Sequence, residues 1–217
     1  MIFNNEVATV VAGSLLQIKA IKLDSVNPFT WASGIKSPIY CDNRKTLSHP
    51  QIRTHIRQNL VKIIQEVYGD VDVIAGVATG AIAQGALVAQ EMGLPFIYVR
   101  SSNKAHGLEN KIEGAWQAGQ SVVVIEDLVS TGGSSLRAVE ALREAGLYVK
   151  GMAAIFTYGL DAATENFKQA NCKLYTLTNY ATAIEKAIAE DYIKREELDT
   201  LLEWRKDPSN WKKTAQV

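Results

Sequence analysis

The chain has 217 residues, of which 47% are hydrophobic and 21% charged, and its formal net charge is zero at pH 7. This length accommodates one buried core with a small appendage, so we expect a single domain over residues 1–217. Balanced charge without a basic cluster disfavours nucleic acid as a partner, and no apolar run is long enough to cross a membrane. Cys41 and Cys172 lie outside any CxxC spacing, which disfavours disulfides and zinc and favours a reducing cytoplasm.

Residues 1–47 are expected to form a small N-terminal hood that begins with a helix. Val7, Val11 and Leu15 recur at helical spacing. Glu6 precedes this apolar stretch and no basic region does, which is not the pattern of a signal peptide. The stretch is therefore predicted to be an amphipathic helix of the mature protein.

A second helix is predicted over residues 48–69, at the start of the main body (48–217). Ser48 has the position of an N-cap, Gln51 completes a capping box, and Pro50 falls in the first turn. Gly69 follows the last apolar position and is expected to end the helix.

Beyond this helix, apolar runs of strand length alternate with helical patterns. Such alternation predicts an α/β fold in which a mostly parallel central sheet is flanked by helices. Ligands of such sheets bind beyond the carboxyl ends of the strands. The expected strands are 71–77, 96–100, 121–127, 148–156 and 173–177, with helices at 82–92 and 134–146.

The most informative segment is VVVIEDLVSTGGSS, residues 122–135, in which a buried strand leads through a small polar loop into a helix. Glycines permit close backbone approach, hydroxyl groups donate hydrogen bonds, and the start of a helix attracts anions. This combination suits a monophosphate. Neither GxxxxGK[ST] nor GxGxxG is present, so a generic ATP or NAD loop is disfavoured. The residues concerned are Ser130, Thr131, Gly132, Gly133 and Ser134.

Two adjacent carboxylates, Glu126 and Asp127, precede this loop. They would repel a phosphate unless they accept hydrogen bonds from sugar hydroxyls beside it, and a ribose 5-phosphate meets both requirements. The alternative is that these acids merely cap the following helix.

This segment resembles the motif with which type I phosphoribosyltransferases bind phosphoribosyl pyrophosphate (PRPP). The resemblance implies the type I phosphoribosyltransferase fold. It also implies that PRPP contacts Glu126, Asp127, Leu128, Val129, Ser130, Thr131, Gly132, Gly133 and Ser134. The segment VATGA, residues 77–81, is similar to the pyrophosphate loop of the same family.

A long polar connection, residues 101–120, separates two predicted strands and has the length of a functional lid. The alternative is a solvated loop with scattered charges. RSSNKAHGLENKIEG resembles the catalytic loop of orotate phosphoribosyltransferases, which implies that Arg100, Lys104 and His106 are catalytic and bind PRPP. Many relatives have a lysine where this chain has Ser101.

The segment from Asn27 to Arg44 resembles the substrate segment of the same family, in the branch common in Gram-positive bacteria. The resemblance implies that Ser130, Tyr40 and Lys36 bind orotate. Tyr40 is alternatively a core aromatic residue, and Lys36 a solvated surface lysine. Ala32 replaces a lysine of other members, and residues 157–167 lack their arginine for the orotate carboxylate.

Together these resemblances imply transfer of phosphoribosyl from PRPP to orotate, giving orotidine 5′-monophosphate and pyrophosphate in pyrimidine biosynthesis. They imply a Mg²⁺ cofactor held chiefly by substrate oxygens and water, and a homodimer with shared active sites. Two alternatives stay open: a phosphoribosyltransferase for another base, and a PRPP-sensing regulator without turnover.

Overall fold

The computed structural model describes residues 1–31, 34–100 and 111–212. Its centre is a six-stranded sheet in the order β10-β9-β8-β5-β6-β7, and every neighbouring pair is parallel except β6 with β7. The mostly parallel sheet predicted from the sequence is confirmed. The strands are β5 (Val73–Val77), β6 (Phe96–Val99), β7 (Ile112–Glu113), β8 (Ser121–Val129), β9 (Tyr148–Thr157) and β10 (Leu174–Asn179).

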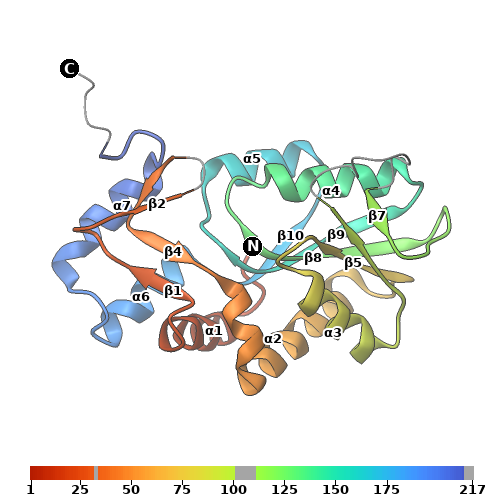
Figure 1. Ribbon diagram of the computed structural model, residues 1–217, viewed down its shortest axis with the longest axis horizontal. Helices are drawn as coiled ribbons and strands as arrows, with labels where there is room; N and C mark the ends of the chain where they lie inside the picture. The colour runs from red at the N-terminus through yellow and green to blue at the C-terminus, as the bar shows by residue number, and fades with distance from the viewer. Residues whose placement is uncertain (32–33, 101–110, 213–217) are drawn as a thin grey trace.

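Helices cover both faces of this sheet (Figure 1). One face carries α1 (Asn5–Gln17), α2 (Pro50–Ile63) and α3 (Ile82–Met92), and the other carries α4 (Gly133–Glu144) and α5 (Asp161–Gln169). Successive residues of a strand point to opposite faces, so residues 122–125 of β8 are all apolar because both of its faces are covered there. Val123 and Ile125 join one hydrophobic cluster, whereas Val122 and Val124 join the other.

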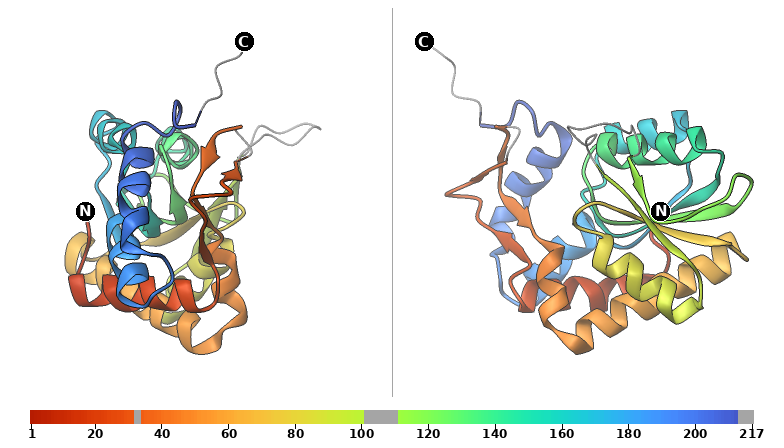
Figure 2. Two further views of the ribbon diagram at one scale, coloured as in Figure 1. Left: turned by 90° about the vertical axis from the view of Figure 1, so that its left-hand side faces the viewer. Right: turned by 45° about the vertical axis from the view of Figure 1, so that its right-hand side comes forward.

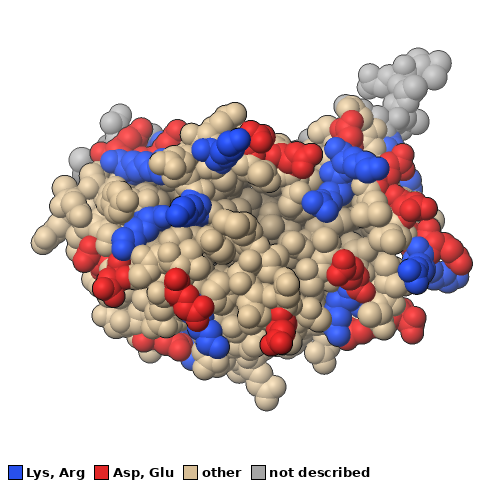
Figure 3. Space-filling view, turned by 180° about the vertical axis from the view of Figure 1, so that it is seen from behind, with Lys and Arg blue, Asp and Glu red and all other residues tan. Residues whose placement is uncertain are grey.

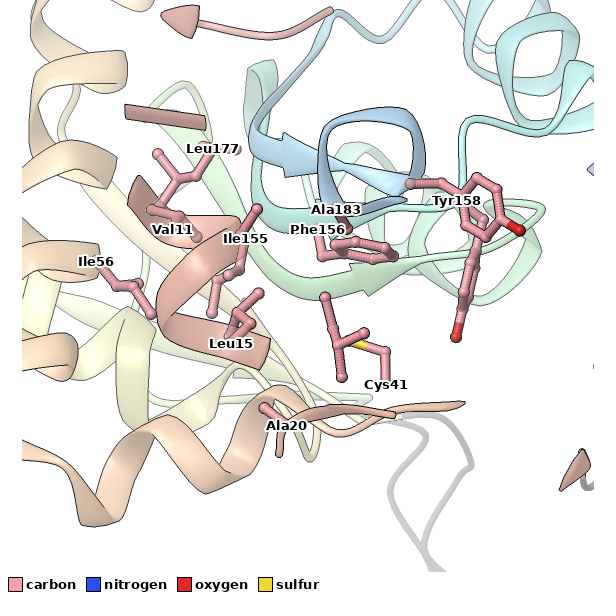
Figure 4. Packing of buried hydrophobic residues seen from close by; sticks show 14 of the residues in the cluster. Val11, Leu15, Ala20, Cys41, Ile56, Ile155, Phe156, Tyr158, Leu177 and Ala183 are labelled. Carbon is pink, nitrogen blue, oxygen red and sulfur yellow. The ribbon is translucent and has the colours of Figure 1, made fainter. Parts of the chain in front are cut away.

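The cluster beneath the sheet contains the apolar stripe of α1. Val11 and Leu15 point from α1 toward Ile155 of β9 and Leu177 of β10 (Figure 4). The helix begins where Asn4 accepts a hydrogen bond from the Val7 amide at 3.0 Å. The amphipathic N-terminal helix predicted from the spacing is therefore confirmed.

The start of α2 differs from the capping box predicted at Ser48. Residues Asn43–Ser48 form a 3₁₀ helix, η1, which ends as the His49 amide donates to the Thr46 carbonyl at 3.1 Å. His49 occupies the N-cap without a side-chain hydrogen bond, and Pro50 is the first helical residue. The prediction was wrong because Ser48 belongs to the preceding turn. The short π-helix η2 (Ile64–Tyr68) continues α2, and Gly69, with φ of 67°, ends it as predicted.

The N-terminal hood contains two small antiparallel ladders. β1 (Ile21–Leu23) pairs with β4 (Ile39–Cys41), and β2 (Phe29–Thr30) pairs with β3 (Lys36–Ser37). These strands lie beside the C-terminal helices α6 (Tyr180–Ala189) and α7 (Leu198–Lys206), as both turned views show (Figure 2). The hood and the C-terminal helices thus lie together at one end of the sheet.

Trp204 of α7 joins these two parts. Its side chain is fully buried, and its indole Nε1 donates to the Lys36 carbonyl at 3.1 Å. Its ring lies 5.6 Å from that of Trp31, 5.7 Å from Tyr158 and 5.4 Å from Tyr180. Aromatic residues in such contacts bury large areas in defined geometries. These contacts pack α7 onto the hood and the body of the protein.

The surface of the described residues is mixed in charge. On the face in Figure 3, Lys and Arg side chains are interspersed with Asp and Glu, so this face presents no broad field of one sign. No helix in the described ranges has both the length and the apolar character needed to cross a membrane.

Replacing Trp204 by alanine should lower the free energy of unfolding by about 3–5 kcal/mol, because it leaves a large cavity where the hood meets α7. Urea titration followed by circular dichroism measures this change. Leu202→Ala, at an exposed site on the same helix, is the matched control and should change stability by less than about 0.5 kcal/mol. Similar losses in the two variants would contradict the anchoring role.

Candidate active site

A cavity of about 500 Å³ opens where β5, β6 and β8 end. This is the edge of the sheet where α/β proteins bind their ligands. Its walls come from the hood, from the loop before α3, from Arg100 and Lys111, and from the first turns of α4. Of the predicted site residues, it is lined by Arg100, Glu126, Asp127, Leu128, Ser130 and Ser134.

Glu126 is buried at the end of β8, with 5% of its surface exposed. Its Oε2 accepts a hydrogen bond from Ser135 Oγ at 2.7 Å, and its Oε1 accepts one from the Asp127 amide at 2.9 Å. Burial, followed by the nearby charge of Asp127, raises the pKa of the Glu126 carboxyl well above its usual range, and the Ser135 hydrogen bond opposes this. Ionisation of Glu126 therefore costs more free energy in the folded protein than in water.

Asp127 is positioned through its neighbours. Asn43 of the hood donates from Nδ2 to the Asp127 carbonyl at 2.6 Å. The Asp127 carboxylate lies so close to Gly80 that a Cβ at that position would collide with it. Glycine is therefore required in the loop before α3, and the close approach brings this loop beside the carboxylate.

The loop after β8 leaves its backbone amides available at the start of α4. Gly132 has φ of 83° and acts as N-cap without a side-chain hydrogen bond, and the first turn of α4 contains no acidic residue. A Cβ at Gly132 would also lie 2.6 Å from the Phe167 ring. The loop is also held by α5, because Asn166 Nδ2 donates to the Thr131 carbonyl at 2.9 Å. Helix starts of this kind bind anions.

The second loop at the cavity lies between β5 and α3. Thr79 and Gly80 line the cavity, and Ala81 is the N-cap of α3 without a side-chain hydrogen bond. The Ala78 amide donates to the Val99 carbonyl at 2.8 Å, which ties this loop to the end of β6. Two helix starts thus converge on one pair of carboxylates, an arrangement suited to a ligand with two anionic groups joined by a hydroxylated unit.

Comparison with known proteins agrees with this geometry. Residues 43–190 match the family described as phosphoribosyl transferase domain. The chain is 59% identical over 201 residues to an orotate phosphoribosyltransferase of Porphyromonas gingivalis, covering 93% of this chain and 96% of that protein. The chain belongs to the orotate phosphoribosyltransferase family.

Other members of the family agree in sequence and in fold. An orotate phosphoribosyltransferase of Listeria monocytogenes is 55% identical over 203 residues, 94% of this chain and 97% of that protein, which fits the predicted resemblance to the Gram-positive branch. The crystal structure of orotate phosphoribosyltransferase from Aeropyrum pernix superposes with a TM-score of 0.73 at 27% identity, covering 81% of this chain and 97% of that one. The predicted type I phosphoribosyltransferase fold is confirmed.

The predicted lid residues of this family member are described only in part. The Arg100 amide donates to the Lys111 carbonyl at 2.8 Å, and the Arg100 Nε lies 3.4 Å from Glu113 Oε1. The two ends of the intervening segment therefore meet at the cavity wall. Lys104 and His106 lie outside the described residues.

Two predicted orotate-binding residues lie in the hood but do not line the cavity. Lys36 Nζ donates to Thr30 Oγ1 at 2.8 Å across the small β2–β3 ladder. Tyr40 is 40% exposed, so it is not a core aromatic residue, and its ring centroid lies 5.9 Å from that of Phe29. The neighbouring Cys41 does line the cavity.

Sequence reasoning missed three cations of the cavity wall: Arg44, Lys111 and Arg137. Arg44 is oriented by Asp42, whose Oδ1 accepts from the Arg44 Nε at 2.7 Å. Arg137 follows the predicted phosphate residue Ser134 by three positions, and residues at this spacing share one face of a helix. That spacing was the available signal for Arg137.

Glu126→Gln should raise the free energy of unfolding near pH 7, because it removes a carboxyl whose pKa is raised by burial in the folded protein. The folded state holds this proton more tightly than the unfolded chain, whose glutamates ionise near about pH 4.3. The unfolded state therefore binds fewer protons above that pH, and stability falls as pH rises.

The gain from Glu126→Gln should thus be small below about pH 4 and larger at neutral pH, as measured by urea titration across that range. Glu140→Gln, at an exposed site on α4, removes the same charge without the burial and serves as the control. A gain that is independent of pH would show that burial of the charge is not its cause.

Proposed function

We infer that this chain transfers the phosphoribosyl group of PRPP to orotate, forming orotidine 5′-monophosphate and releasing pyrophosphate. The observation that carries this inference is the convergence of two helix starts on the Glu126–Asp127 pair in one cavity. PRPP has a sugar between a phosphate and a pyrophosphate. The cavity has the matching order: one helix start for an anion, two carboxylates that can accept hydrogen bonds from sugar hydroxyls, and a second helix start for an anion. The close sequence relatives named above support orotate as the base.

In the proposed complex, Glu126 and Asp127 accept hydrogen bonds from the ribose hydroxyls. The loop from Leu128 to Ser134 surrounds the 5-phosphate, with Ser130 also beside orotate. Its backbone is suited to this role because the bend at Gly132 is fixed and the α4 amides face outward.

The reaction requires stabilisation of the negative charge that grows on the departing pyrophosphate. Bond breaking should run ahead of bond making, as in other glycosyl transfers with oxocarbenium character. We propose that Arg100, Lys104 and His106 supply the stabilising positive charge. We assign no essential general base, because orotate can enter already ionised at its ring nitrogen. Tyr40 and Lys36 are proposed to bound the orotate site from the hood.

We also propose Mg²⁺ as the cofactor. Among the residues that the structure describes, no group of three or more His, Cys, Asp or Glu side chains is placed to hold a metal ion. The cavity nevertheless contains carboxylate oxygens, the hard ligands that Mg²⁺ accepts together with substrate oxygens and water. When bound with pyrophosphate, Mg²⁺ would neutralise part of the charge of the pyrophosphate.

We propose that the protein works in a reducing cytoplasm. The two cysteines are free and buried, which supports this proposal.

Release of pyrophosphate tests the function directly. With PRPP and Mg²⁺, orotate should be turned over, whereas uracil, adenine and hypoxanthine should react far more slowly. Faster reaction with any of those three bases would establish a phosphoribosyltransferase for another base. Binding of PRPP without turnover of any base would instead establish a PRPP-sensing regulator.

We further propose a homodimer in which Lys104 of one subunit serves the cavity of the other. Homodimers of Lys104→Ala and of Asp127→Ala should then both be nearly inactive, because every site lacks one of the two groups. In a mixed dimer, one site lacks both groups and the other has both intact, so subunit exchange should restore activity. Activity is measured on heterodimers isolated with two different affinity tags.

The control for this complementation is each single variant exchanged with itself, which should stay inactive. If each lid served its own subunit, both sites of a mixed dimer would still lack one group. Confirmed heterodimers without activity would therefore exclude the shared site.

A further inference from the structure

Arg137 lies on the cavity-facing side of α4, one turn after the helix begins. Ser134 and Arg137 both line the cavity, and their spacing places them on the same face of the helix. Long helical side chains lean toward the helix N-terminus. Accordingly, the Arg137 guanidinium lies over the first turn, with one terminal nitrogen 3.7 Å from the position that a Cβ would take on Gly133.

Arg137 is exposed to solvent, and the start of α4 offers it no stabilising negative charge. The start of a helix carries a partial positive charge, so a guanidinium above it is repelled rather than stabilised. The first turn of α4 contains no acidic residue, and the Gly132 N-cap offers no side-chain oxygen. Among the described residues, no carboxylate lies within ion-pair distance of Arg137.

Two of the carboxylates that line the cavity have partners other than Arg137. Glu126 accepts from Ser135 and from the Asp127 amide, and Asp42 binds Arg44. The Asp127 carboxylate lies against Gly80 of the other loop. The cavity therefore presents Arg137 together with the first amides of α4, which have no partners within the helix.

We propose that Arg137 is a phosphate-binding residue that donates from its guanidinium to the 5-phosphate of PRPP. The inference rests on the proposed function, because that function supplies the phosphate at the start of α4. The planar fork of arginine suits two phosphate oxygens. The pyrophosphate is the less suitable partner, since its proposed loop precedes α3 and lies across the sheet end at β5, whereas Arg137 shares a helical turn with the 5-phosphate loop.

The experiment compares two probes on the full chain by titration calorimetry: ribose 5-phosphate, and pyrophosphate with Mg²⁺. Arg137→Gln should weaken binding of ribose 5-phosphate roughly 10- to 100-fold, the range expected for a lost charge-assisted hydrogen bond. Binding of pyrophosphate should be unchanged. Arg137→Lys keeps the charge without the fork and should fall between the parent and Arg137→Gln.

Arg195→Gln is the matched control, because it removes one positive charge at an exposed site outside the cavity. It should leave both affinities unchanged, and urea titration should show that all variants are folded. Unchanged binding of ribose 5-phosphate to Arg137→Gln would overturn the proposal, as would a loss confined to pyrophosphate or equal for both probes. Failure of the proposed function is distinguishable, since a parent chain that binds ribose 5-phosphate without turning over orotate still allows the Arg137 comparison.

Discussion

Two adjacent carboxylates at the end of a buried strand repel each other, and much of the surrounding structure holds them in place. Ser135 donates to Glu126, Asn43 donates to the Asp127 carbonyl, and Gly80 leaves room for the Asp127 carboxylate. These three residues come from α4, from the hood and from the loop before α3. Contacts with Glu126 and Asp127 therefore bring three separate segments of the chain together.

The hood depends on two anchors of different kinds. Asn43 donates a partly buried hydrogen bond to the backbone of β8, and Trp204 of α7 donates to the Lys36 carbonyl while packing among aromatic rings. The first anchor fixes the end of the hood nearest the carboxylates, and the second fixes the small β2–β3 ladder. Because α7 follows the sheet in sequence, the hood segment that we propose to bound the orotate site is completed only when the C-terminal helices are in place.

The sequence predicted what local periodicity and composition determine. Continuous apolar runs revealed β5, β8 and β9, and the strand-loop-helix order revealed the loop from Ser130 to Ser134. The edge strand β7 was missed because two residues show no periodicity, and its pairing with β6 depends on a contact across the long connection. Arg44 and Lys111 were missed because their positions facing the cavity follow from tertiary contacts, whereas Arg137 was missed although its spacing from Ser134 was a local signal. The capping box at Ser48 failed for a related reason, since a 3₁₀ turn competed for that residue.

The short edge strand also limits where the lid cations can act. β7 pairs Ile112 with Val99, and the Arg100 amide donates to the Lys111 carbonyl, so the connection leaves and rejoins the sheet at the cavity wall. Lys104 follows Arg100 by four residues, and an extended chain spans at most about 3.5 Å per residue, so its Cα must lie within roughly 14 Å of that of Arg100. If Lys104 serves the neighbouring subunit, the carboxylate pair of that subunit must lie close to Arg100. The distance can be no more than this roughly 14 Å plus the length of the lysine side chain.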